Sequence, residues 1–259
     1  MGAAIAATTR AVLGRAPYRI AVETYCFHDV DLAATLAHTK ALGLEFLELH
    51  DGHLPRDASI SELTRAKAAM RAAGIKAPGV YIHDAFTGQD LVDRAIFAYA
   101  TTMGFEYING GPKHEALPLL NRFVAEYGIQ IAIHNHGPKS RYETLDDVIA
   151  VLDAHPRISA CVDIGHFARS QVNPVAAIRR LAGRTVAVHI KDVDSRGENT
   201  VLGEGTIDLQ GVFAALAQTR FNGLMVLEYE GDFDDMSARL AGMRRSLSVM
   251  RRLIARADN

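Results

Sequence analysis

The chain has 259 residues, of which 49% are hydrophobic and 22% are charged. This composition is typical of a globular protein with a sizeable core, and the length suits one large α/β domain or two small ones. The formal net charge of -2 excludes the strongly basic balance that nucleic-acid binding requires, so we expect no nucleic-acid partner.

The first 17 residues are rich in alanine and mildly apolar, but no basic residue precedes the apolar part, as a secretory signal would require. Arg10 and Arg15 interrupt this segment too early for a membrane span. Cys26 and Cys161 lie far apart inside apolar runs, which predicts two buried packing residues rather than a disulfide. We therefore expect an N-terminal extension over 1–17 and a cytoplasmic protein without a membrane partner.

Short apolar runs alternate with amphipathic stretches along the rest of the chain, which is the pattern of repeated βα units. The runs that we expect to form strands cover residues 19–25, 44–50, 75–83, 105–110, 129–135, 158–164, 185–192 and 224–230.

The stretches between these runs predict helices, because several begin at Asp or Ser and end at Gly, as in "DLAATLAHTKALG" and "SISELTRAKAAMRAAG". An open doubly wound sheet is the competing architecture, but "ETYCFHD" follows the first strand where that fold places a glycine-rich phosphate loop. Eight strand–helix units in a chain of this length favour a closed barrel. We predict a single (β/α)8 barrel over residues 18–259.

The carboxyl ends of barrel strands carry the active site in this architecture. Polar side chains gather at those predicted ends, where Glu48, His50, His83, Asp84, Asn109, His134, His136, Asp163, His166, His189, Lys191, Glu228 and Glu230 are found. Side chains alternate along a strand, so His134 and His136 share one face, as do His189 and Lys191.

Each of these groups alone has an ordinary structural explanation. A single strand-end histidine is more often a hydrogen-bonded structural residue than a metal ligand, and Asp163 alone fits a cap on the following loop. Glu230 and the acidic residues after it are interpreted as a solvated loop, and Lys191 with Asp192 as a surface ion pair of little energetic value.

These explanations do not account for the convergence of His134, Asp163, His189 and Glu228 from four consecutive strands. Two imidazoles and two carboxylates form a mixed nitrogen and oxygen ligand set, which suits Mn²⁺, Zn²⁺, Co²⁺ or Fe²⁺. We therefore predict one divalent metal site. Mn²⁺ is the expected ion, and Zn²⁺, Co²⁺, Fe²⁺ and Mg²⁺ are the alternatives.

The motifs "CVDIGHF", "VHIKDVD", "LGEGTIDL" and "VLEYEGD", in this order after "IAIHNHG", make the sequence resemble the xylose isomerase-like barrel superfamily. More narrowly, it resembles the His-Asn-His-containing subgroup of its sugar phosphate isomerases and epimerases. The superfamily also contains ketose 3-epimerases, inosose dehydratases and endonuclease IV. The resemblance extends over nearly the whole chain from about Tyr18.

The resemblance implies one divalent ion held at the ends of the fifth to eighth strands, commonly by Glu, Asp, His and Glu. Asp163, His189 and Glu228 match the last three of these ligands, whereas His134 stands where the family usually has the first glutamate. Imidazole remains an adequate ligand. The substitution nevertheless argues against an epimerisation that uses two opposed glutamates as bases.

The reactions of such sites share the removal of a proton from the carbon next to a carbonyl. We predict that Glu228 is the base and that His136, His166 and Lys191 are candidates to return the proton. Return to the opposite face of the carbon gives an epimer and return to the next carbon gives an isomer. Return to a leaving hydroxyl gives a dehydration. We expect an isomerase or epimerase of a keto-sugar, with a dehydratase or lyase of a keto-cyclitol or keto-glycoside as the alternative.

Further contacts to a carbohydrate substrate are expected from other strand ends and one loop. A metal beside Lys191 should depress the pKa of its ammonium. The loop "LGEGTID" offers a phosphate site, but a tight turn with a cap on Asp208 explains it better, so an unphosphorylated substrate is preferred. Tyr25, Phe27, Phe86 and Phe167 are candidate pocket walls. The predicted substrate-binding residues are Glu48, His50, His83, Asn109 and Arg196.

Two further classes of protein stay open at this stage. An endonuclease IV-like phosphodiesterase would need more metal ligands and a basic face for DNA, which the balance of 28 Lys and Arg against 30 Asp and Glu does not supply. A sugar-binding protein without catalytic activity would carry no metal. Barrels of this kind often pair, so a homodimer is also left open.

Overall fold

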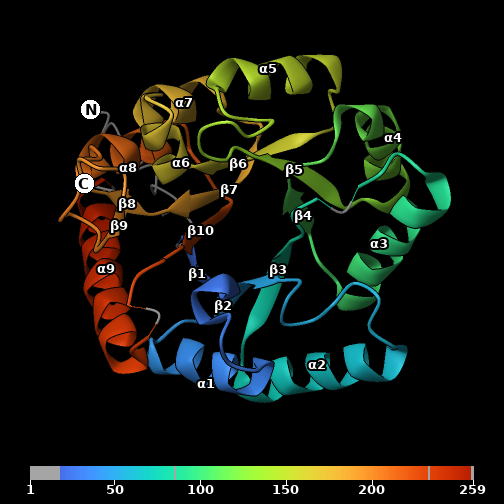
Figure 1. Cartoon of the computed structure of the whole chain (residues 1–259), viewed down its shortest axis with the longest axis horizontal. Helices are drawn as coiled ribbons and strands as arrows, with labels where there is room; N and C mark the ends of the chain where they lie inside the picture. Colours follow the sequence, from blue (N-terminus) through green and yellow to red (C-terminus); the bar gives the residue numbers. More distant parts are fainter. Residues whose placement is uncertain (1–17, 85, 233, 258–259) are drawn as a thin grey trace, which may run out of the picture.

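The computed structural model describes residues 18–84, 86–232 and 234–257, so the N-terminal extension expected over 1–17 lies outside the described residues (Figure 1). The described elements run along the chain as alternating strands and helices, and helices surround the strands in Figure 1. No helix within the described ranges is long and apolar enough to cross a membrane.

Eight parallel strands close into one barrel in the order β1-β10-β7-β6-β5-β4-β3-β2. Each strand falls inside one of the predicted apolar runs, and the prediction of a single (β/α)8 barrel is confirmed. The strands are β1 (Arg19–Glu23), β2 (Phe46–His50), β3 (Lys76–Tyr81), β4 (Tyr107–Gly110), β5 (Gln130–His134), β6 (Ser159–Asp163), β7 (Thr185–Ile190) and β10 (Leu224–Leu227).

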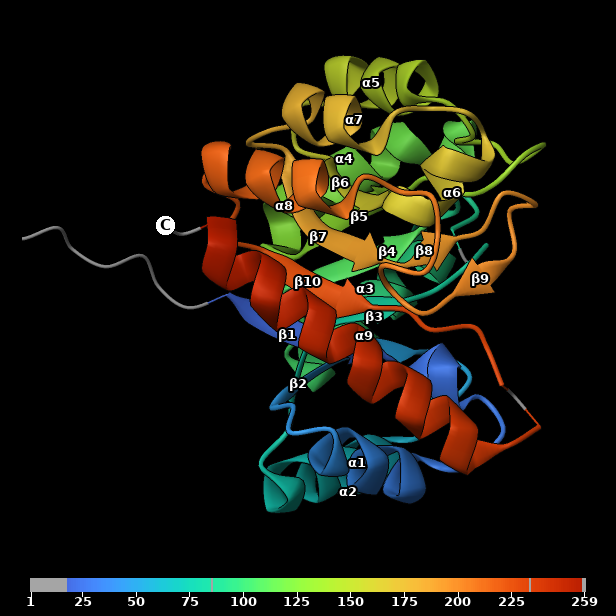
Figure 2. The same ribbon diagram turned by 90° about the vertical axis from the view of Figure 1, so that its left-hand side faces the viewer.

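A small antiparallel hairpin, β8 (Asp192–Val193) with β9 (Asn199–Thr200), stands beyond the end of β7. In Figure 2 the arrows of β7 and β10 point toward the edge of the barrel where this hairpin lies. The carboxyl ends of the strands therefore open on the hairpin side, where the long connecting loops gather.

The helices pack around the outside of the barrel, and several of them begin and end at the caps that the sequence predicts. Ser59 forms a capping box with Glu62 at the start of α2, and Gly74 ends that helix in the left-handed conformation. The helical segments are η1 (Thr24–Phe27), α1 (Leu32–Ala41), α2 (Ile60–Ala73), α3 (Asp90–Met103), η2 (His114–Ala116), α4 (Leu117–Tyr127), α5 (Leu145–Ala154), α6 (Ile164–Arg169), α7 (Pro174–Arg180), α8 (Leu209–Gln218) and α9 (Met236–Ala257).

The interior of the barrel is filled by small side chains around one large one, Tyr107. A Cβ atom at Gly79 would lie 2.1 Å from the ring of Tyr107, so the glycine provides the space that this ring occupies. Cys161 belongs to the same interior cluster, and both cysteines are buried and free, as the sequence predicts. Tyr107 fills the barrel directly below the polar strand ends.

Arg239 of α9 fixes the loop that follows β1. Its side chain is fully buried and donates hydrogen bonds to the carbonyl of Cys26 and to both carboxylate oxygens of Asp29, at 2.6 and 3.0 Å. The guanidinium group matches the carboxylate in a two-point contact that an ammonium group cannot make. The last helix thus holds η1 against the mouth of the barrel.

We expect Arg239→Met to lower the free energy of unfolding by about 2–3 kcal/mol, because it leaves the Cys26 carbonyl and Asp29 without their donor. Urea unfolding of Arg245→Met is the matched control, since Arg245 lies on the same helix and pairs with Glu204 at the surface. That control should lose no more than about 1 kcal/mol. Equal losses in the two variants would contradict the role of Arg239.

Candidate active site at the carboxyl ends of the strands

A cavity of about 250 Å³ opens at the carboxyl ends of the barrel strands. Its walls come from five barrel strands, β1, β2, β3, β5 and β7, and from the segments that follow β1, β3, β5, β6 and β10. The residues that line it are Glu23, Tyr25, His50, Tyr81, His83, His134, His136, His166, His189, Glu228 and Glu230. This concentration of imidazole and carboxylate groups in one concave site is typical of a catalytic or metal-binding centre.

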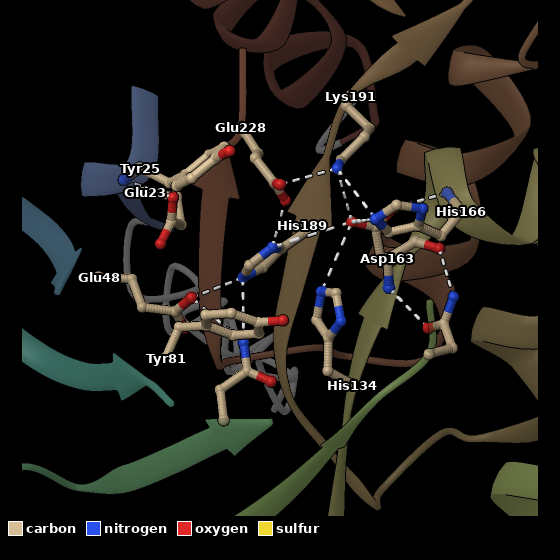
Figure 3. Close-up of polar contacts among 12 residues, drawn as sticks. Glu23, Tyr25, Glu48, Tyr81, His134, Asp163, His166, His189, Lys191 and Glu228 are labelled. Atoms are coloured by element: carbon tan, nitrogen blue, oxygen red, sulfur yellow. Dashed lines mark hydrogen bonds and ion pairs between the residues drawn. The ribbon is translucent and has the colours of Figure 1, made fainter. Parts of the chain in front are cut away.

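His134, Asp163, His189 and Glu228 converge, with ligand atoms that all lie within 4.8 Å of one another. Asp163 Oδ2 is 3.6 Å from His134 Nε2 and 3.9 Å from His189 Nδ1. His189 Nδ1 is also 2.6 Å from Glu228 Oε2. All four residues are buried, and Figure 3 shows their side chains pointing toward one another. The structure therefore brings together the four residues predicted from the sequence as metal ligands.

Two atoms of this cluster suit a bound cation. His134 Nε2 and Asp163 Oδ2 are buried and have no hydrogen-bond partner among the described residues. Asp163 Oδ2 has the Lys191 ammonium 3.2 Å away as an ion-pair partner. A buried polar atom without a hydrogen bond is costly, and a divalent ion would bind both His134 Nε2 and Asp163 Oδ2. Burial lowers the pKa of His134, so its imidazole is neutral and has a lone pair to offer a metal. The donor set fits the divalent ion that the sequence predicts.

Asp163 is oriented by its neighbours so that one carboxylate oxygen remains for the cluster. Its backbone N–H donates to Asn135 Oδ1, and Asn135 Nδ2 donates to its carbonyl, both at 2.8 Å. Asp163 Oδ1 caps α6 by accepting the backbone N–H of His166 at 2.7 Å. Asp163 Oδ2 is consequently left facing His134, His189 and Lys191. The cap expected for Asp163 thus exists beside its place in the cluster.

Lys191 lies between the two carboxylates. Its Nζ is 3.2 Å from Asp163 Oδ2 and 2.8 Å from Glu228 Oε1. A Cβ at Gly165 would lie 2.2 Å from the Lys191 side chain, so the glycine of "CVDIGHF" lets the lysine reach this position. Burial by itself would lower the pKa of Lys191, but the nearby Asp163 and Glu228 raise it above its usual range. The depressed pKa expected from the sequence is the effect of a bound metal, and the carboxylates around the ammonium act in the opposite direction.

Glu48 supports His189 from below. It is fully buried, its Oε2 is 2.6 Å from His189 Nε2, and it accepts hydrogen bonds from Tyr107 and Asn109. Burial by itself would lower the pKa of His189, but Cys161, Glu48 and Glu228 raise it well above its usual range. With both ring nitrogens held by carboxylates, His189 is fixed in orientation.

The remaining predicted site residues divide between the cavity and other places. The cavity lining includes His136 and His166, which were expected to transfer protons. It also includes the predicted residues His50, His83 and Tyr25. The lining does not include Glu48 or Asn109, which lie fully buried behind His189, and Phe27, Phe86 and Phe167 are part of the hydrophobic core. Arg196 lies on the β8–β9 hairpin with a 78% exposed side chain and pairs with Asp194, so the structure does not bring it to the cavity.

Three cavity residues were missed from the sequence. Glu23 is the last residue of β1, and the rule of polar groups at strand ends would have found it. Tyr81 ends β3 and contacts His83 Nδ1 at 2.7 Å. Glu230, interpreted as part of a solvated loop, instead lines the cavity 3.6 Å from Lys191 Nζ and accepts a hydrogen bond from Asn199.

Asp192 is buried rather than part of a surface ion pair. Its carboxylate accepts the backbone N–H groups of Gly203, Gly205 and Ile207 at 2.9 to 3.2 Å. Asp208 caps α8 by accepting the N–H of Gly211. These contacts favour the tight turn that was preferred for "LGEGTID", because the backbone donors that a phosphate would use are already occupied.

Comparison with known families gives a match to the model of the xylose isomerase-like TIM barrel over residues 114–253. An inosose dehydratase from Clostridium botulinum is 28% identical over 134 residues, which is 44% of this chain and 44% of that protein. The matching segment therefore spans less than half the length of this curated relative.

Solved structures match over most of the chain. An uncharacterised protein from Parabacteroides distasonis has a TM-score of 0.70 and 25% identity over 91% of this chain and 98% of its own. A D-psicose 3-epimerase from Clostridium cellulolyticum has a TM-score of 0.74 and 14% identity over 91% of this chain and 99% of its own. At that identity the second likeness concerns the fold alone.

We expect purified protein to carry about one divalent ion per chain and the variants His134→Ala and Asp163→Asn to retain less than about a tenth of it. Loss of a residue that merely orients a ligand already weakens metal binding about 10–100-fold, so loss of a ligand should cost more. Elemental analysis measures the content, with His155→Ala, a histidine at the end of α5, as the matched control. Protein that stays metal-free after incubation with Mn²⁺, Zn²⁺, Co²⁺ and Fe²⁺ would overturn the metal site.

Proposed function

This chain belongs to the xylose isomerase-like TIM barrel family, and on that premise we propose that it is a divalent-metal-dependent enzyme of keto-sugars or related keto-polyols. The proposed step is removal of a proton from the carbon next to the carbonyl. The observation that carries this proposal is the convergence of four buried ligand residues, three of which line one cavity. Two of their atoms have no hydrogen-bond partner among the described residues.

His134, Asp163, His189 and Glu228 would hold the ion, for which Mn²⁺ is the proposed identity. When bound, the ion supplies Lewis-acid stabilisation of the negative charge that develops on the substrate's carbonyl oxygen. The carboxylates of the cluster outnumber the cationic groups around them, since Glu48, Asp163 and Glu228 face Lys191 and the imidazole of His189, which is neutral when it binds an ion. An added divalent cation fits this excess of negative charge.

Glu228 is the proposed base. It lies on the wall of the cavity, and its carboxylate is held by Lys191 and His189 at 2.8 and 2.6 Å. Although burial by itself would raise the pKa of Glu228, Lys191 and His189 lower it well below its usual range. The group is therefore ionised at neutral pH and its orientation is fixed, which are the conditions for accepting a proton from a bound substrate.

Isomerisation or epimerisation is the first proposed outcome. It needs a second group to return the proton to carbon. The cavity lining offers His136 and His166 as candidates, and Lys191 is a further candidate, buried beside the ligand cluster. Burial lowers the pKa of His136 to about 4 and that of His166 to about 2, so both imidazoles are neutral. His134 replaces the strand-five glutamate of the family, so the second base must be one of these other groups.

Dehydration of a keto-cyclitol is the second candidate, and the relationship to an inosose dehydratase in sequence favours it. In this outcome the proton goes to a hydroxyl that leaves the adjacent carbon, so no opposed glutamate base is required. The same ligand cluster and the same base serve both outcomes. An unphosphorylated carbohydrate remains the proposed substrate class, because Asp192 occupies the backbone donors of the glycine-rich turn.

We expect the Mn²⁺-loaded wild type in D₂O to incorporate deuterium next to the carbonyl of a ketose or of inosose. Glu228→Gln should reduce the rate of incorporation by ~10²–10⁴-fold, which is the usual contribution of a positioned base. Mass spectrometry and NMR of recovered substrate and product measure the incorporation and identify epimer, isomer or dehydrated product.

Because Glu228 is also a proposed ligand, metal content is measured on the same samples, and the rate is compared per bound ion. A Glu228→Gln variant that keeps its ion and exchanges deuterium at the wild-type rate would rule out Glu228 as the base. Wild type that binds the ion but exchanges no proton with any keto-sugar or keto-cyclitol tested would overturn the proposed reaction class.

A further inference from the structure

Glu23 lies on the other side of Glu228 from the ligand cluster. In the barrel, β1 stands between β10 and β2, and Val22 is in register with Leu227, so Glu23 and Glu228 follow side by side. β7, which leads to Lys191, adjoins β10 on its opposite flank. Figure 3 accordingly shows Glu23 apart from Lys191, with Glu228 between them. The cavity thus has a second carboxyl group next to the proposed base.

The surroundings of the two glutamates differ in kind. Glu228 is held by the side chains of Lys191 and His189, whereas Glu23 Oε2 accepts one backbone N–H, that of Tyr25, at 2.6 Å. Glu23 Oε1 has no hydrogen-bond partner among the described residues, and the residue is 2% exposed. Burial raises the pKa of Glu23, and the neighbouring Glu228 and Glu48 raise it further.

The other acidic groups near the cavity are committed elsewhere. Glu48 contacts His189, Tyr107 and Asn109 behind the cavity wall. Glu230 lies 3.6 Å from Lys191 Nζ and accepts from Asn199. Glu23 is therefore the carboxyl group of the cavity lining that forms no ion pair among the described residues and has an oxygen without a hydrogen-bond partner there. Two neighbouring carboxyls in contrasting environments are a usual arrangement for an acid and a base.

We propose that Glu23 is the general acid of a dehydration in this cavity and protonates the hydroxyl that leaves next to the carbon deprotonated by Glu228. The inference rests on the proposed function and selects dehydration among its outcomes. A keto-cyclitol or keto-sugar with a hydroxyl on the second carbon from its carbonyl is the corresponding substrate class.

The step balances without an oxidant or a reductant. Glu228 takes the proton from the carbon next to the carbonyl, and the C–H electron pair is first held as the enolate of the substrate. The enolate then re-forms the carbonyl, and the electron pair forms a double bond to the following carbon. The C–O bond at that carbon breaks, its electron pair stays on oxygen, and Glu23 supplies the proton that releases water. Glu228 is then protonated and Glu23 ionised, and proton exchange with solvent restores both.

The test compares Mn²⁺-loaded wild type and Glu23→Gln on inosose in D₂O. Glutamine keeps the acceptor for the Tyr25 N–H, so we expect the variant to keep its metal content and its deuterium exchange. Formation of the dehydrated product should fall by ~10²–10⁴-fold, the usual range for a general acid. Parallel loss of metal, exchange and product would contradict the role of Glu23 as an acid.

An analogue in which fluorine replaces the leaving hydroxyl makes the test specific, because fluoride leaves without a proton. Glu23→Gln should eliminate fluoride at nearly the wild-type rate, although it has lost most of its activity on inosose. Glu230→Gln is the matched control from the same cavity, and it should change the two rates by the same factor. Equal loss on both substrates in Glu23→Gln would overturn the proposal.

The wild-type result separates this inference from the proposed function. If wild type exchanges deuterium but forms an epimer or isomer and no dehydrated product, the role of Glu23 as an acid for dehydration is wrong and the proposed proton abstraction stands. If wild type neither exchanges deuterium nor changes any keto-sugar or keto-cyclitol, the proposed function fails and the role of Glu23 fails with it.

Discussion

The ion pairs of Lys191 with Asp163 and Glu228 are the interaction on which the rest of the site depends. All three side chains are buried, and a buried charge without a partner is strongly destabilising. The pairing explains the glycine at position 165, because a Cβ there would meet the lysine side chain. It also fixes the proposed base and one proposed metal ligand in a single arrangement.

Support for this arrangement extends downward into the barrel. His189 stands between Glu228 above and Glu48 below, as Figure 3 shows, and Glu48 in turn accepts from Tyr107. Tyr107 fits inside the barrel because Gly79 leaves space for its ring. A continuous set of contacts therefore runs from the packed interior to the cavity. Such outer contacts fix the orientation of an imidazole before any ligand binds.

Much of the site follows from the order of residues, because a closed parallel barrel brings all strand ends to one face. The apolar runs predicted the strands, and their terminal polar residues predicted His134, Asp163, His189 and Glu228 as neighbours. Glu23 was not predicted although it obeys the same rule, because the predicted strand runs to Tyr25 while β1 ends at Glu23. Motif order also pointed to the family that the comparison identifies.

The sequence by itself determined the barrel fold, the polar residues at the carboxyl ends of its strands and the capping residues of its helices. These features depend on local periodicity and on the order of the strands. Only the tertiary structure decided which polar groups face the cavity. The sequence predicts both Glu48 and Arg196 as substrate-binding residues. In the structure Glu48 is buried behind His189, whereas Arg196 is exposed on a hairpin. The tertiary structure also decided that Glu228 has an ion-pair partner while Glu23 Oε1 has no hydrogen-bond partner among the described residues. The protonation of a buried carboxyl depends on the charges around it and not on its position in the chain.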